Sequence, residues 1–338
     1  MGNAPHVAYD TQALGNGMKD PVSKEPVLSV VLGTDNMDRV ATVIDSLAAQ
    51  TIAKAIELIL VIAEPPAAST RELIAQRFHS LKVLTVASIP SLAVARAKGV
   101  LEAEAPYVFI AETHAYPDPD LAERIVATLS GEWSVVVPGF RNANPRSAVS
   151  WAGFLSDYGA WAASLDAGEI QRGPSHDVGF RRSVLLEFGD RLEPALTFGD
   201  EMNLTLQARG QRTYFDPSAG IQHVNISGFK SFLGERFLTG MLIGAYRRAR
   251  WGTPRRVVYA LGAPLIPIVV LSRIQKGVRE VAQRESLPAG TIPTLVFGVI
   301  VKAVGEMRGY LLGAPEQAEE KMTGYEVRKL AFNAHEES

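Results

Sequence analysis

Glu112, Thr113 and His114 are the residues that most suggest chemistry, because they follow directly on an apolar run and precede two prolines. A carboxylate and an imidazole two residues apart can both bind a divalent cation, and either can move a proton. The plainer interpretation is a buried strand that ends where polar residues begin. Which of the two holds depends on the elements that position the motif.

Short apolar runs alternate with amphipathic stretches of about ten residues along the first part of the chain. We expect strands at residues 27–33, 58–63, 81–86, 107–111 and 132–138. This alternation predicts βαβ units and a mostly parallel α/β sheet flanked by helices. Ligands bind beyond the carboxyl ends of such strands, and Glu112 and His114 are expected at one of those ends.

A second acidic motif and a second histidine lie downstream. Asp200 and Glu201 stand at the start of a predicted helix that ends at Gly210, and His223 ends a predicted short strand. The helix dipole also favours acids at a helix N-terminus, and a histidine can simply end a strand, so these roles stay open. The stretch 146–180 is expected to be loop and helix that line a cleft.

The composition of the 338 residues excludes several classes of site. The chain has no cysteine, which excludes disulfides, thiolate zinc sites and cysteine nucleophiles and suits a reducing compartment. The formal net charge of −2 provides no global field for nucleic acid, so no nucleic-acid partner is expected. Residues 1–25 lack an apolar core segment and are expected to form a flexible arm rather than a secretory signal.

The composition changes after about residue 228. A basic run without acids is followed by two uncharged apolar stretches, 257–272 and 286–301, both shorter than the roughly 20 residues of a membrane-spanning helix. The arginines of the run are Arg247, Arg248, Arg250, Arg255 and Arg256. Two interpretations stay open: a buried helical subdomain, or helices that lie in the cytoplasmic leaflet with arginines on anionic headgroups.

Taken in order, these segments resemble glycosyltransferase family 2, whose inverting enzymes have the GT-A fold. Residues 27–51 are similar to the family's opening strand, loop and helix, and residues 92–114 match its Ala-Arg-x-x-Gly helix and metal-motif strand. Residues 173–189 resemble the acceptor-side segment. The resemblance implies a GT-A domain over residues 26–228 and leaves 229–338 as a C-terminal helical, membrane-associated region.

The resemblance implies a metal site at the opening motif. The family usually carries Asp-x-Asp at this strand end, where it holds a divalent cation against the diphosphate of a sugar nucleotide. Glu112 and His114 occupy that position, and His223 matches a histidine that supplies a further ligand. Imidazole suits Mn²⁺ better than the harder Mg²⁺, although both cations stay open.

The resemblance also implies a catalytic base. An inverting transfer needs a carboxylate that takes the proton of the acceptor hydroxyl. The family uses the second acid of a Glu-Asp pair, and this chain has the reversed order Asp200-Glu201. We expect Glu201 to be the base and Asp200 its neighbour.

Residues for the nucleotide follow from the same resemblance. The loop of Gly33, Thr34 and Asp35 is expected to cradle base and ribose, and Arg96 to reach base or phosphate. In the family, the second strand ends in an acidic residue that contacts uracil. Apolar residues occupy that position in this chain, and Glu64, which follows them, is expected to take over the contact.

The resemblance implies that His176 and Asp177 lie near the donor sugar and the acceptor. For Arg181 or Arg182 two interpretations stay open, a contact with phosphate or a place on the surface. The predicted function is a metal-dependent inverting hexosyltransferase that moves one sugar from a nucleotide-diphosphate sugar to a membrane-linked acceptor. We expect a polyprenyl-linked or cell-surface glycan in polysaccharide biosynthesis, at the cytoplasmic face of the membrane, with peripheral or re-entrant attachment.

Two alternatives remain. One is a degenerate GT-A domain that binds nucleotide or glycan as an assembly partner without turnover. The other is a nucleotidyltransferase, which is disfavoured because no Gly-rich loop with Lys or Arg follows the first strand.

Overall fold

The computed structural model describes residues 25–197 and 199–333. Within them, nine strands form one sheet in the order β3-β2-β1-β4-β8-β6-β9-β5, with β7 paired to β9. The strands are β1 (Leu28–Thr34), β2 (Ile56–Ile62), β3 (Ser80–Thr85), β4 (Tyr107–Ala111), β5 (Ala115–Pro117), β6 (Val135–Asn142), β7 (Gly168–Ile170), β8 (Val178–Arg181) and β9 (Thr213–His223). The predicted arm, except for Glu25, lies outside the described residues.

Strand directions place most carboxyl ends at one edge of the sheet. Strands β3, β2, β1 and β4 are parallel, and β6 is parallel to β9. Strand β8 is antiparallel to both β4 and β6. It therefore links two groups of strands, one ending in β4 and one starting with β6, that run in the same direction. Strands β1 and β2 are buried along their whole length, which explains their mostly apolar sequences. The predicted mostly parallel α/β sheet is confirmed, but the short strands β7 and β8 lie where only loop and helix were expected.

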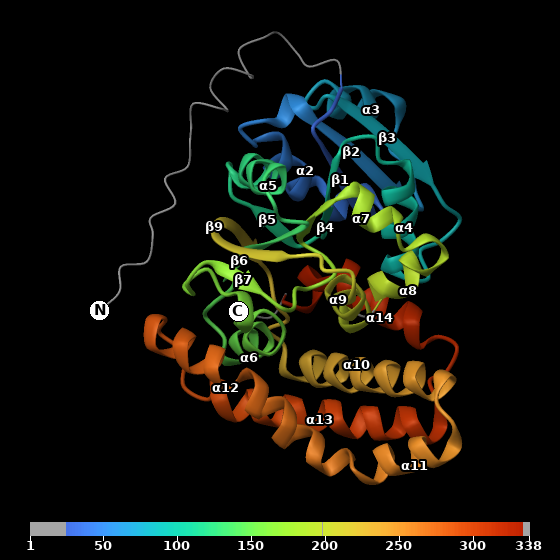
Figure 1. The fold of residues 1–338 in the computed structure, drawn as a ribbon, viewed down its shortest axis with the longest axis vertical. Helices are drawn as coiled ribbons and strands as arrows, with labels where there is room; N and C mark the ends of the chain where they lie inside the picture. Colours follow the sequence, from blue (N-terminus) through green and yellow to red (C-terminus); the bar gives the residue numbers. More distant parts are fainter. Residues whose placement is uncertain (1–24, 198, 334–338) are drawn as a thin grey trace.

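Helices cover the sheet (Figure 1). They are α2 (Ala41–Ala48), α3 (Ala68–Ala75), α4 (Leu92–Glu102), α5 (Leu121–Ser130), α6 (Ala148–Asp157), α7 (Arg182–Leu186), α8 (Leu192–Thr197) and α9 (Gly199–Ala208). Helix α4 begins after Ser91, whose hydroxyl accepts a hydrogen bond from the amide of Ala93, an ordinary N-cap. A Cβ at Gly99 would stand 2.3 Å from Val31 Cγ1, so the glycine lets α4 approach β1 closely.

The C-terminal helices form a layer beside the sheet, in which α10 and α13 run side by side (Figure 1). They are α10 (Phe229–Arg250), α11 (Thr253–Leu261), α12 (Ile266–Arg284), α13 (Thr291–Leu312) and α14 (Ala318–Val327), followed by the 3₁₀ turn η6 (Lys329–Phe332). Phe232, Leu295 and Val299 join the main hydrophobic core, so this layer shares its packing with the sheet. Among the described helices none alone is long and apolar enough to span a membrane; the segments Thr253–Leu261 and Ala263–Arg284, bent by 48°, meet that test only together.

Glycines bring the backbones of α10 and α13 into contact. A Cβ at Gly240 would lie 1.9 Å from the carbonyl oxygen of Lys302, and one at Gly305 would lie 2.1 Å from that of Phe237. Gly244 and Gly309 repeat the pattern four residues further on in each helix. Small residues at this spacing allow two helices to pack backbone to backbone.

We predict that Gly305→Ala lowers the free energy of unfolding by about 1–3 kcal/mol, because the added methyl group forces the two helices apart. Thermal unfolding measures the loss. Gly324→Ala is the control, since nothing lies within 4 Å of its built Cβ and alanine is the better helix former. Equal melting temperatures for Gly305→Ala and the wild type would contradict the close contact.

Candidate metal centre and active site

Strand pairing explains why two histidines far apart in the sequence meet. Glu112 follows β4 at the carboxyl edge of the sheet, and β9 ends at the same edge with His223. Strand β5 then runs back antiparallel to β9 in a register that pairs Ala115 with His223. His114, the residue before Ala115, is therefore delivered beside His223.

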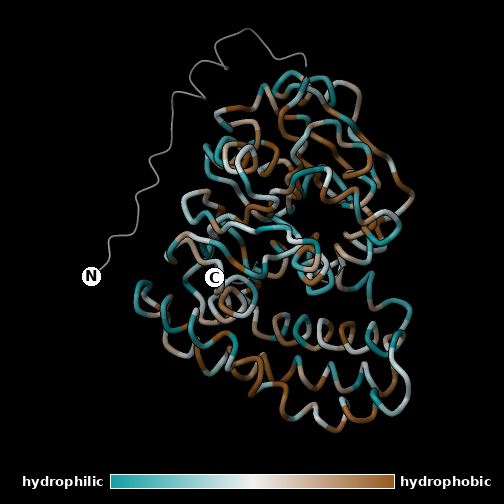
Figure 2. The backbone as a smooth tube through the Cα atoms, in the orientation of Figure 1, coloured by the Kyte–Doolittle hydropathy of each residue, from teal (hydrophilic) through white to brown (hydrophobic). Residues whose placement is uncertain are grey.

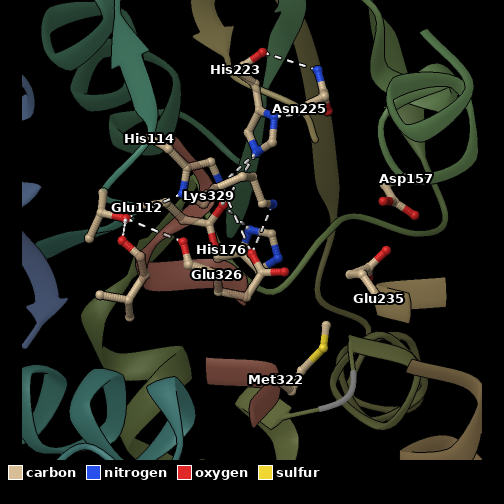
Figure 3. Close-up of polar contacts among 12 residues, drawn as sticks. Glu112, His114, Asp157, His176, His223, Asn225, Glu235, Met322, Glu326 and Lys329 are labelled. Carbon is tan, nitrogen blue, oxygen red and sulfur yellow. Dashed lines mark hydrogen bonds and ion pairs between the residues drawn. The ribbon is translucent and has the colours of Figure 1, made fainter. Parts of the chain in front are cut away.

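Glu112, His114 and His223 face one another in a tight cluster (Figure 3). Glu112 Oε2 lies 3.4 Å from His114 Nε2 and 3.5 Å from His223 Nε2, and the two Nε2 atoms are 3.1 Å apart. The other carboxylate oxygen, Oε1, accepts a hydrogen bond of 2.7 Å from Arg96 Nη2. The Tyr158 hydroxyl reaches Glu112 Oε2 at 3.5 Å, and its ring packs on His223.

Burial and charge set the protonation of the cluster. The three side chains are between 0 and 3% exposed. Burial by itself would raise the pKa of Glu112, but the imidazoles of His176 and His114 hold it well below its usual range. Burial, and after it the positive charge of Lys329, holds the pKa of His114 well below its usual range. Burial also lowers the pKa of His223. The cluster thus has an ionised carboxylate and neutral imidazoles at neutral pH, the states that bind a cation.

Asn225 selects the tautomer of His223. Its Oδ1 lies 3.2 Å from His223 Nδ1 and accepts a hydrogen bond from it, which leaves the Nε2 lone pair directed at the cluster. The amide of Asn225 is fixed in turn, because its Nδ2 donates to Asn142 Oδ1 at 3.0 Å. Asn225 is a positioning residue that the sequence patterns did not indicate.

The donor set fits a divalent transition metal. A cation bound at about 2.1 Å by oxygen and nitrogen separates neighbouring ligand atoms by roughly 3.0–3.5 Å. The three separations of 3.1 to 3.5 Å in the cluster match this geometry. Two imidazoles with one carboxylate suit Mn²⁺ better than Mg²⁺, which prefers oxygen ligands. The role of these residues as ligands stays a prediction.

His176 and Asp177 enter the same cluster from the loop before β8. His176 Nδ1 lies 3.3 Å from Glu112 Oε2, and Glu112, His176 and Asp177 form a second group with ligand atoms within 4.8 Å. Asp177 adopts φ +51°, the left-handed conformation that is uncommon for residues with a side chain. Burial, followed by the charge of Glu112, raises the pKa of Asp177 well above its usual range, which favours the protonated form of this side chain.

The predicted nucleotide loop lies next to this cluster. The Thr34 side chain is buried, and the amide of Glu64 donates to the carbonyl of Asp35 at 3.1 Å, so the ends of β1 and β2 meet. Gly33 packs on α4, where its built Cβ would lie 3.0 Å from Ala95. The guanidinium of Arg96 donates to Glu112, and its contact with base or phosphate stays a prediction.

Arg181 is not brought to the site. Strand β8 runs antiparallel to β4, and its last residue pairs with Tyr107 at the start of β4, on the edge opposite Glu112. Its guanidinium donates hydrogen bonds to the carbonyls of Leu129 and Gly131. At the same edge, the amide of Arg182 donates to the carbonyl of Pro106. The predicted phosphate contact of either arginine is contradicted by this placement.

The acidic pair starts α9 beside the loop that carries His176. Asn203 in α9 exchanges two hydrogen bonds with the backbone of Gly173, at 2.8 and 2.9 Å. Glu201 accepts hydrogen bonds from Tyr246 at 2.6 Å and Arg191 at 3.1 Å. The side chain of Asp200 is 68% exposed and lies 3.6 Å from Arg172.

Sequence comparison finds no family model and no curated protein that matches this chain. Solved structures do match its fold. A mannosyltransferase from Pyrobaculum calidifontis, in complex with GDP-Man and Mn²⁺, aligns with a TM-score of 0.51 and 15% identity over 90% of this chain and 94% of that one. The chain has a GT-A-like fold with a C-terminal helical region.

Two other solved glycosyltransferases are more distant. TarS of S. aureus in complex with UDP matches with a TM-score of 0.46 and 16% identity, over 85% of this chain and 92% of that one. GalNAc-T7 with UDP, GalNAc and Mn²⁺ matches with a TM-score of 0.45 and 14% identity, over 59% of this chain and only 43% of that one. At such identities the likeness concerns the fold alone.

We predict that His114→Gln weakens Mn²⁺ binding by about a hundredfold or more. Loss of a residue that only hydrogen-bonds to a metal ligand typically lowers metal affinity about 10- to 100-fold, and loss of a ligand itself costs more. The electron paramagnetic resonance signal of free Mn²⁺ measures the affinity. His79→Gln is the matched control, since His79 precedes β3 at the opposite edge of the sheet. Unchanged Mn²⁺ affinity in His114→Gln would exclude this residue as a ligand.

Proposed function

We propose that this chain is a metal-dependent, inverting glycosyltransferase that moves one sugar from a nucleotide-diphosphate sugar to an acceptor hydroxyl. The observation that carries the proposal is the cluster of Glu112, His114 and His223 at the carboxyl edge of a GT-A-like sheet. A cation bound there would act as a Lewis acid on the leaving diphosphate. The resemblance of the motifs to glycosyltransferase family 2 supports the inverting stereochemistry.

The chain's own residues have separate tasks in this proposal. Glu112 and the two histidines would hold the cation opposite the diphosphate, and Arg96 fixes the Glu112 carboxylate through its other oxygen. The loop of Thr34 and Asp35 lies at the end of the neighbouring strand β1 and is the proposed site of base and ribose. Burial of the cluster excludes water, which strengthens these electrostatic interactions.

Glu201 is the proposed base, and Tyr246 positions it. The Tyr246 hydroxyl and Arg191 each occupy one carboxylate oxygen, so the carboxylate is held in one orientation. Asp200 lacks this support, because its side chain is mostly exposed on the helix N-terminus. The contacts therefore favour the assignment that the sequence suggested.

We predict that Glu201→Gln lowers kcat about a hundredfold or more with little change in nucleotide binding, the usual scale for losing a general base. Asp200→Asn is the matched control and should be mild. The assay is Mn²⁺-dependent release of nucleoside diphosphate from a panel of sugar nucleotides. The reverse ranking moves the base to Asp200, and a wild type without turnover on any donor favours the alternative, an assembly partner that only binds.

A membrane-linked acceptor is the second part of the proposal. Most of the exposed large apolar side chains in the described residues belong to the stretch 257–312, among them Leu261 at 78% and Ile268 at 65% exposure. The brown tube along α11 and the start of α12 lies on the outer side of the helical layer (Figure 2). Apolar faces of this kind suit a helix that lies in a lipid headgroup region.

The arginines of the basic run contribute less to membrane attachment than the sequence suggests. Arg247 bonds Glu306 at 2.5 Å, and Arg248 bonds the carbonyls of Tyr310 and Leu311, so both turn inward. The exposed Arg255, stacked on Trp251 at 4.0 Å, remains available for headgroups. We propose peripheral attachment at the cytoplasmic face, driven mainly by apolar burial.

We predict that the full chain floats with anionic vesicles at low salt and that Leu261→Asp/Ile268→Asp does not, because each change places a charge in the apolar face. Leu73→Asp is the control, as Leu73 is 64% exposed on α3. A double variant that floats like the wild type would show that this face is not the attachment surface. Truncation at 228 is a poorer test, since it removes Phe232 and Val299 from the main core.

A further inference from the structure

The last described segment, residues 318–333, comprises α14 and η6 and lies over the candidate metal centre. Thr113 Oγ1 donates to the carbonyls of Glu326 and Val327 at 3.5 Å, and Arg328 Nη2 lies 3.4 Å from Asp35 Oδ2. Its end is tied to the loop after β9, where the amide of Ser227 donates to Asn333 Oδ1 at 2.8 Å. We call residues 318–333 the C-terminal strap.

The strap leaves too little room for a donor. A cavity of about 230 Å³ lies between the nucleotide loop and the strap, lined by Asn36, Arg39 and His114 on one side and by Val327 and Arg328 on the other. Sites for molecules of drug size are roughly 300–1,000 Å³. A nucleotide-diphosphate sugar therefore reaches the cluster only if the strap moves.

Apolar contacts hold the strap chiefly against α10, where Ala318, Met322 and Tyr325 pack with Leu238 and Met241, while Phe332 packs against the main core. Over the cluster itself its contacts are single hydrogen bonds or ion pairs, such as those of Thr113 with the carbonyls of Glu326 and Val327. The Arg328–Asp35 pair is partly exposed, and exposed pairs contribute little. A segment held in this way can open without unfolding the sheet.

Lys329 carries a buried positive charge beside the cluster. It is 8% exposed, and its Nζ lies 2.9 Å from Glu326 Oε2, which in turn lies 3.9 Å from His114 Nε2 (Figure 3). The carboxylates of Glu326 and Glu112 hold the pKa of Lys329 above its usual range against the effect of burial, so it stays an ammonium. A divalent cation on Glu112, His114 and His223 would face this like charge at close range in a medium of low polarity.

We propose that the C-terminal strap is a gate over the donor site, in which the Lys329 ammonium, paired with Glu326 beside His114, stands next to the cluster in the closed position and is displaced when a divalent cation binds. The proposal rests on the metal site of the proposed function. It makes metal binding and opening of the gate a single coupled event, since the ammonium and the cation exclude each other from one buried cluster.

The first experiment compares Mn²⁺ affinity in full-length variants. Lys329→Met removes the competing charge and keeps the length of the side chain, so Mn²⁺ should bind about tenfold or more tightly. Lys321→Met is the matched control, because Lys321 is exposed on α14 in the same strap and should leave the affinity unchanged. Equal or weaker Mn²⁺ binding by Lys329→Met overturns the gate.

The second experiment needs no variant. Hydrogen–deuterium exchange of wild-type residues 318–333 is measured with and without saturating Mn²⁺, and the gate predicts about fivefold or faster exchange with the metal, because opening exposes the strap amides. Unchanged or slower exchange while Mn²⁺ is bound overturns the gate and leaves the metal site standing. If Mn²⁺ binds neither wild type nor Lys329→Met, the metal site itself fails, and the gate with it.

Discussion

The carboxylate of Glu112 is the charge around which the site is organised. A carboxylate that is 3% exposed is costly to bury unless partners compensate it. Arg96 occupies one oxygen, and His114, His176 and His223 surround the other. These partners come from four separate segments of the chain, so the positions of α4, β5, β8 and β9 all serve one negative charge.

Strand direction decides which residues can supply that compensation. Every strand that ends at the carboxyl edge can deliver a side chain there, and β5 adds one more because it starts at that edge and runs back along β9. The antiparallel strand β8 begins at this edge, so His176 and Asp177, which precede it, enter the cluster, whereas Arg181, which ends it, lies at the far edge. One reversal of direction thus separates residues that lie only a few positions apart in sequence.

This reversal also marks how far the sequence could predict the structure. Alternating apolar runs indicate that strands such as β1, β2 and β4 exist, and the parallel order places Glu112 at a strand end. The apolar pattern does not indicate the direction of the four-residue strand β8, so it does not show that Arg181 lies at the far edge of the sheet. Lys329 could not be found at all, because it is more than two hundred positions from Glu112 and no local spacing links them.

The C-terminal region carries both the exposed apolar face of α11 and α12 and the strap over the metal cluster. Its helices α10 and α13 pack backbone to backbone at their glycines, and Phe232 and Val299 pack in the core of the sheet. The same region carries the exposed apolar face of α11 and α12 at one side and Lys329 at its other end. In the proposed attachment of this face to a lipid surface, such a helical layer would fix the distance between that surface and the cluster. An acceptor hydroxyl held at the surface would then meet the donor at a constant distance, and only the short strap would have to move.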